Sequence, residues 1–211
     1  MAGKPACAGR LIVFEGIDGS GKSTQIELYF NYLKSKKIPA KLISFPRYDQ
    51  FYGSLSGRIL RGELNGNQLS PYLFSLPFAT DRLMAKDQIN NWLKAGITVL
   101  VDRYVWSSVA HQGAKDSAVI DWIVKMEYEV NRLPKEDRVI YLNMPVSASQ
   151  KLMRSKSKDE AEKDVDYQKK VYVLYQQLAG KYHWQVIDCL DKQNHLLSKD
   201  DVAKKIAAAI G

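Results

Sequence analysis

The residues best suited to chemistry lie near the start of the chain, at positions 16–24. They read G-I-D-G-S-G-K-S-T and directly follow the apolar run 11–14. This is the pattern G-x-x-x-x-G-K-[ST] in a strand–loop–helix setting, which is typical of a phosphate-binding loop. Its glycines let the backbone turn tightly enough for successive N–H groups to point at phosphate oxygens. The alternative is a glycine-rich turn with an incidental lysine, but the complete pattern favours binding of a nucleoside triphosphate.

The charged and hydroxyl side chains of this loop have separate uses. Lys22 can reach the β- and γ-phosphates, and the hydroxyl of Ser23 can hold a Mg²⁺ ion. The helix that follows adds the positive end of its dipole to the anion site. The predicted triphosphate contacts are Gly16, Ile17, Asp18, Gly19, Ser20, Gly21, Lys22, Ser23 and Thr24.

Five short apolar runs, separated by helix-length segments, must form the scaffold that positions this loop. They are residues 11–14, 40–45, 97–101, 138–143 and 184–188. They are continuously apolar rather than alternating, as expected of strands buried on both faces of a parallel sheet. The alternation of strands and helices predicts an α/β protein, with a three-layer P-loop fold whose five-stranded parallel sheet is flanked by helices.

Several helix boundaries carry their own signals. Ser70 followed by proline predicts the start of a long helix that runs to about residue 96. Pro77 lies inside that helix and is expected to kink or interrupt it. Three further polar residues are expected to cap later helices, namely Asp116, Ser147 and Ser198.

Ligands of parallel α/β sheets bind at the carboxyl ends of the strands, so the residues there matter most. Besides the phosphate loop, F-P-R-Y occupies positions 45–48, F-x-x-D-R positions 78–82 and D-R-Y positions 102–104. These four segments occur in this order and at this spacing in thymidylate (dTMP) kinases. The chain resembles that family over nearly its whole length, from about residue 10 to its last helix. Each tripeptide alone is weakly specific, whereas the four together are strongly specific.

Three charged residues at the strand ends can be interpreted physically. Arg47 and Arg103 each follow a strand end, where two guanidiniums can clamp the phosphate of a monophosphate acceptor by bidentate hydrogen bonds. The alternative is that both are surface arginines paired with local carboxylates. Asp102 resembles the acidic residue that positions Mg²⁺ through water. Its alternative role is to accept backbone N–H bonds at the strand end.

The resemblance implies how the acceptor's base is held. Phe78 lies four residues before Arg82, so both share one helix face. By similarity, Phe78 stacks on thymine while Arg82 reaches its O4 atom, and Ser108 lies against the pyrimidine edge. Without the resemblance, Phe78 would be read as a core residue.

The resemblance also implies the residues around the sugar. Asp18 corresponds to a carboxylate that contacts the 3′-hydroxyl, while Phe45 and Tyr48 would wall the sugar and base. The bond between Phe45 and Pro46 resembles one that is cis in the family. At His111 relatives usually carry an aromatic wall near the deoxyribose. His111 departs from this pattern, so it either affects sugar discrimination or is a packed helix residue without a role.

A basic segment is expected to form a short mobile lid at about residues 151–166. Some thymidylate kinases carry an arginine in the phosphate loop where this chain has Gly19. Phosphoryl transfer needs cations around the migrating group, so the charge must come from elsewhere. Arg154, Lys156 and Lys158 are the candidates, followed by a polar stretch typical of mobile lids. The alternative is an exposed, solvated loop.

Composition limits the remaining classes. The 211 residues are 45% hydrophobic and 26% charged, which fits one soluble domain spanning 1–211. No stretch approaches the ~20 apolar residues of a membrane span, and residues 1–10 lack a signal peptide's apolar core. Cys7 and Cys189 match no metal or redox spacing, so a cytoplasmic location is expected. The net charge of +8 comes from dispersed lysines and arginines, which favours small nucleotides over nucleic acid.

Together these features predict a kinase that transfers the γ-phosphoryl group of ATP to dTMP with Mg²⁺. The expected catalytic residues are Lys22, Arg103 and Arg154, and the expected metal residues are Ser23 and Asp102. The resemblance implies a homodimer, with no nucleic acid or membrane partner. Two alternatives are another pyrimidine nucleotide or deoxynucleoside kinase, and a P-loop switch protein. The chain has no N-K-x-D sequence to read guanine, which disfavours a GTPase.

Overall fold

Five parallel strands form the middle layer of the molecule. The computed structural model describes residues 9–64, 68–153 and 164–211. The strands are β1 (Leu11–Glu15), β2 (Ala40–Ser44), β3 (Thr98–Asp102), β4 (Arg138–Asn143) and β5 (Gln185–Asp188), in the spatial order β2-β3-β1-β4-β5. Each predicted apolar run is therefore a strand, with boundaries within one residue of those expected. The order places β1, and the loop that follows it, at the centre of the sheet.

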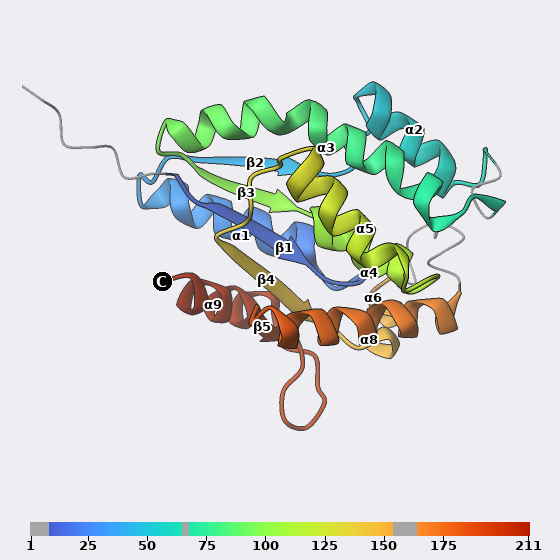
Figure 1. Ribbon diagram of the computed structural model, residues 1–211. Helices are drawn as coiled ribbons and strands as arrows, with labels where there is room; N and C mark the ends of the chain where they lie inside the picture. The colour runs from blue at the N-terminus through green and yellow to red at the C-terminus, as the bar shows by residue number, and fades with distance from the viewer. Residues whose placement is uncertain (1–8, 65–67, 154–163) are drawn as a thin grey trace, which may run out of the picture.

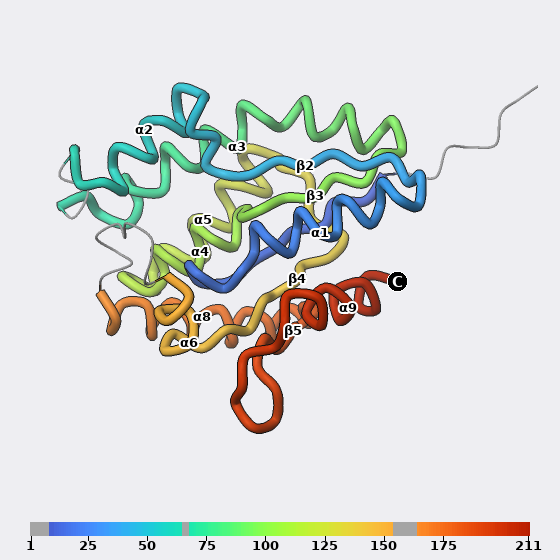
Figure 2. Tube along the Cα trace, turned by 180° about the vertical axis from the view of Figure 1, so that it is seen from behind, coloured from blue at the N-terminus to red at the C-terminus, as the bar shows by residue number. Residues whose placement is uncertain are grey.

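Helices cover both faces of this sheet (Figures 1 and 2). On one face lie α1 (Lys22–Ser35) and α9 (Lys199–Ile210). On the other lie α3 (Pro71–Lys94), α4 (Val105–Gly113), α5 (Val119–Lys125) and α8 (Val165–Lys181). The remaining described helices are α2 (Phe51–Leu60), the π-helical turn η2 (Met126–Val130) and α6 (Val146–Leu152). The three-layer α/β fold with a five-stranded parallel sheet is thus confirmed.

The three central strands, β3, β1 and β4, are buried on both faces because each contributes to two separate cores. In β1, Leu11 and Val13 pack into the core under α3, α4, α5 and α8. Ile12 and Phe14 pack into the core under α1 and α9. Successive strand residues point to opposite faces, so a strand with helices on both sides must be apolar throughout.

Helix α3 runs without a break through Pro77, so the expected interruption is wrong. Pro77 has no N–H to bond to the carbonyl of Leu73, but the backbone stays helical on both sides of it. Hydroxyls in the neighbouring turns bond to other carbonyls of the same helix. Ser75 Oγ donates to the carbonyl of Pro71 at 2.7 Å, and Thr80 Oγ1 donates to that of Leu76 at 2.8 Å.

Among the residues described, no helix has both the length and the apolar character needed to cross a bilayer.

Two of the expected caps are confirmed. The hydroxyl of Ser70 accepts a bond from the backbone N–H of Leu73 at 3.4 Å, at the start of α3. The hydroxyl of Ser198 accepts from the N–H of Asp201 at 3.1 Å, at the start of α9. Each cap satisfies an N–H group that has no partner within its helix.

The other two expected caps are wrong. Helix α6 begins at Val146 with Pro145 in the capping position, so Ser147 already lies inside the first turn. The fixed φ of proline suits a helix start, so the helix begins before Ser147 rather than after it. Asp116 precedes the cap of α5, and its Oδ1 accepts from the N–H of Ala118 at 3.0 Å. Asp116 therefore closes a local turn rather than the helix.

Candidate active site

The phosphate loop lies at the carboxyl edge of the sheet, between β1 and α1. Gly16, Gly19 and Gly21 have φ angles of 147°, 72° and 87°. This region of backbone conformation is costly for residues with a Cβ atom, so the glycines set the path of the loop. Gly21 caps α1, whose first residue is Lys22. The predicted strand–loop–helix arrangement is therefore present.

Lys22 is folded over the loop that precedes it. Its Nζ donates to the carbonyls of Gly16 and Ile17, both at 2.8 Å, and its side chain is buried. An ammonium group has three donors, so one N–H remains for a phosphate oxygen. Burial and the nearby Arg103 lower the pKa of Lys22 to about 8, although Asp18 opposes them.

The two predicted metal residues meet at this edge. The hydroxyl of Ser23 donates to Oδ2 of Asp102 at 2.9 Å, across 79 positions of sequence. The other oxygen of Asp102, Oδ1, is buried and has no hydrogen-bond partner within residues 9–64, 68–153 and 164–211. A hydroxyl beside an unpaired carboxylate oxygen matches the oxygen ligands that Mg²⁺ and its water shell prefer. The residues present therefore fit this ion.

A buried carboxylate that the sequence analysis missed anchors the turn after β3. Glu15 is fully buried, and its Oε1 accepts from the N–H groups of Tyr104 at 2.9 Å and Ser107 at 3.1 Å. Its Oε2 accepts from the hydroxyls of Ser107 at 2.6 Å and Tyr175 at 2.9 Å. These bonds hold the turn that directly follows Arg103, which itself has a left-handed φ of 65°. A charged residue at the end of a wholly apolar strand was the available signal.

Arg103 forms an ion pair with Asp18 of the phosphate loop. Burial would raise the pKa of Asp18, but Arg103 and Lys22 outweigh it and lower the pKa to about 2. The carboxylate is thus ionised at neutral pH. The pair joins the turn after β3 to the loop after β1 and sets both charges on one side of the site.

Arg47 also has a carboxylate partner, Asp81 of the F-x-x-D-R segment. Its Nε donates to Asp81 Oδ1 at 3.0 Å, and its backbone N–H donates to Oδ2 at 2.7 Å. Asp81 is fully buried, and Arg47 does not line the acceptor cavity. The alternative of carboxylate pairing is therefore observed for Arg47 and Arg103 alike.

The bond between Phe45 and Pro46 is cis, as the resemblance implied.

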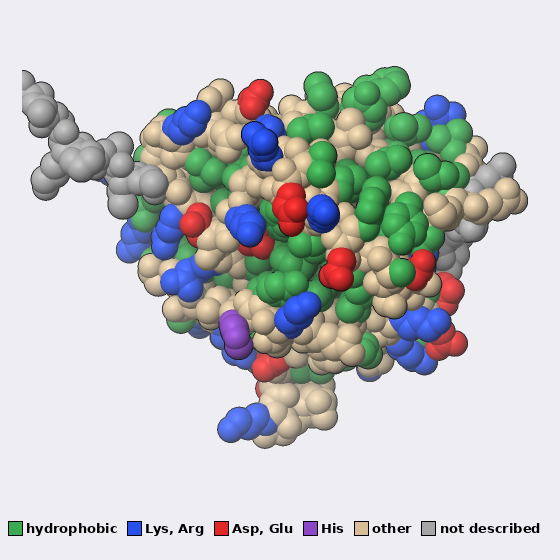
Figure 3. Space-filling model, in the orientation of Figure 1, with side chains coloured by type: hydrophobic (Ala, Val, Ile, Leu, Met, Phe, Trp, Pro, Cys, Tyr) green, Lys and Arg blue, Asp and Glu red, His purple; other side chains and the backbone are tan. Residues whose placement is uncertain are grey.

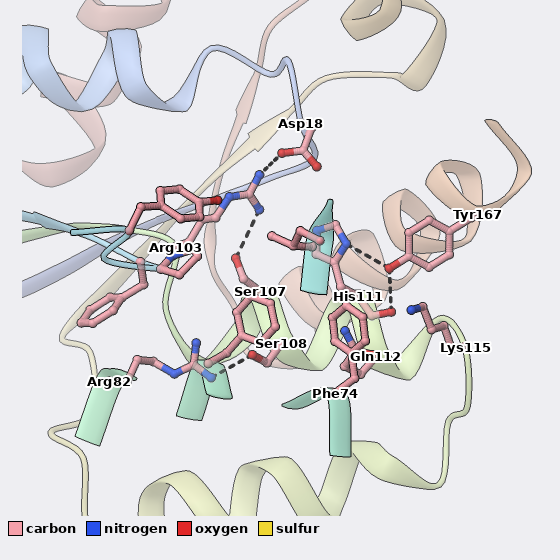
Figure 4. Close-up of a pocket in the computed structure, with 15 residues that line it drawn as sticks. Asp18, Phe74, Arg82, Arg103, Ser107, Ser108, His111, Gln112, Lys115 and Tyr167 are labelled. Carbon is pink, nitrogen blue, oxygen red and sulfur yellow. Dashed lines mark hydrogen bonds and ion pairs between the residues drawn. The ribbon is translucent and has the colours of Figure 1, made fainter. Parts of the chain in front are cut away.

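One cavity collects the other predicted acceptor residues (Figure 4). Its lining includes Asp18, Phe45, Tyr48, Phe78, Arg82, Arg103, Ser108 and His111. It also includes residues that the sequence analysis missed, namely Leu60, Phe74, Ser107, Gln112, Lys115 and Tyr167. Phe74 stacks on Phe78 with ring centroids 5.6 Å apart and planes 11° from parallel. Since Phe78 is only partly buried, a face of this aromatic pair remains available to the cavity.

Arg82 is held almost fully buried at the base of this cavity. Its Nε donates to Glu127 at 2.9 Å, and a second N–H pairs with the same carboxylate. Two more N–H groups donate to Ser108 Oγ at 2.8 Å and to the carbonyl of Tyr104 at 3.2 Å. A guanidinium has five N–H donors, so one is left without a partner among the residues that the structure describes. Glu127 was missed, although its position four residues after buried Ile123 was a signal.

The phosphate loop has no room for an arginine at Gly19. A Cβ atom there would lie 2.6 Å from Cγ of Met153 and 3.0 Å from the carbonyl of Ser149. Met153 therefore occupies the space beside the loop. Arg154, Lys156 and Lys158, the predicted lid cations, lie outside the described residues.

The phosphate loop and the cavity share one edge of the sheet, so a triphosphate and a second, aromatic ligand would be held side by side. This arrangement defines a P-loop nucleoside monophosphate kinase. Residues 14–199 match the family model described as thymidylate kinase. The chain belongs to the thymidylate kinase family.

Individual relatives agree with this assignment. The chain is 33% identical to the thymidylate kinase of Plasmodium falciparum, over 94% of this chain and 90% of that protein. It is 30% identical to the thymidylate kinase of Dictyostelium discoideum, over 95% of this chain and 84% of that protein. The solved structure of thymidylate kinase from Candida albicans superposes with a TM-score of 0.78 at 26% identity, over 96% of this chain and 91% of that one.

Proposed function

We propose that the chain phosphorylates dTMP to dTDP, with ATP as donor and Mg²⁺ as the metal ion. Membership of the thymidylate kinase family supports the reaction. The observation that carries the proposal for this chain is the buried guanidinium of Arg82. It has one uncommitted N–H at the base of a cavity that also holds an aromatic pair and adjoins the phosphate loop. That donor and that surface suit a flat base with a carbonyl oxygen.

On the donor side, the loop N–H groups and Lys22 would bind the β- and γ-phosphates of ATP. Ser23 and the unpaired oxygen of Asp102 would hold Mg²⁺, directly or through water. When bound, the ion neutralises negative charge on the phosphates. The chain's own contribution is to position the two substrates and to keep water out, since no covalent intermediate is required.

On the acceptor side, Arg103 would contact the phosphate of dTMP while it remains paired with Asp18. Arg47, held by Asp81, would act from just outside the cavity lining and keeps further N–H donors for the same phosphate. Asp18 would accept from the 3′-hydroxyl, with Phe45 and Tyr48 beside the sugar and base. Each guanidinium is fixed by a carboxylate before the substrate binds, which lowers the cost of ordering it.

The base would be read by Arg82 and Phe78. The free N–H of Arg82 would donate to O4 of thymine, and Ser108, itself bonded to Arg82, would lie at the pyrimidine edge. Cytosine presents an amine where thymine presents O4. The fifth N–H of Arg82 would then face a donor and have no acceptor, at a cost of ~1–3 kcal/mol.

The test is release of ADP from ATP·Mg²⁺ with dTMP, dUMP, UMP, dCMP, AMP, GMP and thymidine as acceptors. We expect dTMP to give the highest kcat/KM of this panel, with dCMP at least about fivefold lower. Equal values for dTMP and dCMP would contradict the role of Arg82. Higher activity on thymidine than on dTMP would favour a deoxynucleoside kinase, because a nucleoside has no phosphate for Arg103. Hydrolysis of GTP without transfer would favour a switch protein.

We also infer that a lid cation completes the transition-state site, as Gly19 provides none. Arg154 is the arginine of the basic run at 151–158, and a planar fork suits phosphoryl oxygens better than a lysine amine. Arg154→Ala should lower kcat by about 10²-fold, with a smaller effect on nucleotide binding, and Arg154→Lys should recover part of the rate. A solvated loop would instead leave kcat within about threefold.

A second copy of the chain is the proposed partner, packed against α3. Leu73, Leu76, Leu83 and Met84 are between 36% and 64% exposed on this helix. These residues lie on one face of the helix, here called the α3 seam, because positions 73, 76, 80, 83, 84 and 87 are linked by spacings of three and four. Figure 3 has green apolar side chains gathered over the part of the surface that α3 forms. An exposed apolar seam on one long helix suits a symmetric dimer.

A cytoplasmic location and a single kinase domain over residues 1–211 complete the proposal. The family match spans 14–199 of the chain, which supports one domain. The cavity and phosphate loop draw on β1, β3, α3, α4 and α8, so residues from both halves of the sequence build one site.

A further inference from the structure

Two hydrogen-bond acceptors lie next to each other on one wall of the acceptor cavity. Asp18 comes from the phosphate loop and His111 from α4, and Figure 4 shows the ring of His111 between Asp18 and Tyr167. The base end of the cavity is marked by Arg82 and the phosphate end by Arg103. The sugar of a bound nucleotide must therefore pass this wall.

The hydrogen bonds of Tyr167 determine which ring nitrogen of His111 carries the proton. The hydroxyl of Tyr167 donates to the backbone carbonyl of His111 at 3.0 Å. The same oxygen lies 3.1 Å from Nδ1 of the His111 ring. A phenol has one proton, which this carbonyl takes, so Nδ1–H must be the donor to the phenol oxygen. The other nitrogen, Nε2, then carries a lone pair and can only accept while the ring is neutral.

The surroundings keep the ring neutral. Burial lowers the pKa of His111 to about 4. Asp18 favours the charged ring, whereas Arg103, Lys22 and Lys115 oppose it. At neutral pH, Nε2 is therefore an acceptor, and it has no hydrogen-bond partner in the described part of the chain.

We propose that Nε2 of His111 accepts a hydrogen bond from the 2′-hydroxyl of a ribose, so that the chain phosphorylates ribonucleoside monophosphates of thymine-like bases as well as the deoxy forms. The inference rests on the proposed function, which places the base against Phe78 and the phosphate against Arg103. A hydroxyl donates one proton, so two adjacent acceptors match a cis-diol. The 3′-hydroxyl donates to Asp18 and the 2′-hydroxyl to His111. A deoxyribose has a donor for Asp18 alone.

Tyr167 is a positioning residue in this arrangement. It reaches from α8 to bond both the ring and the backbone of His111, and the two rings lie 6.0 Å apart at 47°. Without the phenol oxygen, the proton of a neutral His111 ring is free to move to Nε2. That nitrogen would then be a donor and would no longer accept from a 2′-hydroxyl.

The kinetic test compares dTMP with ribothymidine 5′-monophosphate, which differs only in the 2′-hydroxyl. For the wild-type chain we expect kcat/KM for the two to agree within about a hundredfold. His111→Phe removes the acceptor and should raise the preference for dTMP by at least about fivefold, the lower limit for leaving a hydroxyl unpaired. Tyr167→Phe should raise it in the same direction. A smaller change in His111→Phe would overturn the inference, because the ratio is independent of any general loss of activity.

Tyr172→Phe is the matched control. Tyr172 lies on the same helix and accepts from Gln176 Nε2 at 2.9 Å, away from the cavity. It should leave the preference for dTMP over the ribonucleotide unchanged.

A wild-type chain inactive on dTMP would overturn the proposed function and this inference with it. Activity on dTMP with a preference that His111→Phe leaves unchanged would overturn this inference alone.

The tautomer can be measured without turnover. Nitrogen NMR of the histidine-labelled wild-type chain should show His111 protonated on Nδ1 and unprotonated on Nε2 at neutral pH. The Tyr167→Phe chain should show a shift of the proton toward Nε2, and Tyr172→Phe should match the wild type. A wild-type ring protonated on Nε2 would overturn the inference.

Discussion

Lys22 combines two properties that act against each other: it must be charged to bind phosphate, and it is buried. Its pKa is lowered to about 8 by burial and Arg103. Above that pH the free enzyme loses the ammonium, so kcat/KM for ATP should fall as pH rises through about 8. In the enzyme–ATP complex the phosphates favour the charged form, so kcat should hold to higher pH.

The pH dependence is measured with saturating acceptor and varied ATP between pH 6 and 10. Lys22→Ala should nearly abolish turnover, since a buried cation beside the phosphates is hard to replace. Lys34→Ala, at the exposed end of α1, is the control and should keep the wild-type profile. A kcat/KM for ATP that stays flat to pH 9.5 would contradict the assigned role.

Glu15 offers a second prediction for a single residue. Glu15→Ala should lower kcat/KM for dTMP by about tenfold or more, because the N–H groups of Tyr104 and Ser107 lose their acceptor and no longer fix Arg103. Glu15→Gln should recover most of the loss. Its amide oxygen can accept both N–H bonds, and the hydroxyls of Ser107 and Tyr175 can reverse to accept from its amide NH₂.

Steady-state kinetics and thermal unfolding of both Glu15 variants provide the check. If Glu15 contributes only to stability, both variants will lower the melting temperature while kcat/KM at low temperature stays near that of the wild type. Recovery of the rate by glutamine, but not by alanine, would mark a positioning role.

The sequence identified the arginines of the site, but it missed Phe74, Lys115 and Tyr167 of the cavity and the pairing of each arginine with a carboxylate. Arg47 and Asp81 are separated by 34 positions, and Arg82 and Glu127 by 45. Side-chain types and spacing indicate what a residue can bind, whereas the choice among many carboxylates depends on how the helices pack. For that reason the arginines were predicted, whereas their pairing with Asp81, Asp18 and Glu127 was not.

At the scale of elements, the two serines expected to cap helices provide a matched test. Ser198→Ala should lower the free energy of unfolding by about 1 kcal/mol, because the first turn of α9 loses a hydrogen-bond acceptor. Ser147→Ala removes the same atoms from inside α6, where the hydroxyl is not a cap. Denaturant unfolding of the two variants should separate them, and equal losses would contradict the caps as described.

The three central strands were predicted to within one residue because burial on both faces leaves an apolar run. The edge strands β2 and β5 are partly exposed, and their apolar pattern is weaker. The helix ends were harder to predict, since a serine that caps a helix and a serine just inside its first turn have similar local sequences. Pro145 moved the start of α6, and only the backbone path shows it. Pro77 similarly has a strong local preference that α3 overrides through its packing against the sheet.

At the scale of the whole molecule, the proposed dimer makes the α3 seam the most informative surface. Met84→Lys introduces a charge at an exposed seam position and should shift the molecular mass from twice the 24.0 kDa chain toward one chain. Val173→Lys makes an equivalent change on α8, away from the seam, and should leave the mass unchanged. Light scattering with size-exclusion chromatography measures both. A monomeric wild type would refute the dimer.

The central position of β1 has a consequence for how the chain becomes active during synthesis. This strand is made before both of its sheet neighbours, which are β3, where Phe14 pairs with Asp102, and β4, where Glu15 pairs with Tyr141. Pairing across such sequence separation is slow and cannot begin before those strands leave the ribosome. The phosphate loop is thus translated before both of the strands that support it, and it has both of them only after β4 has emerged.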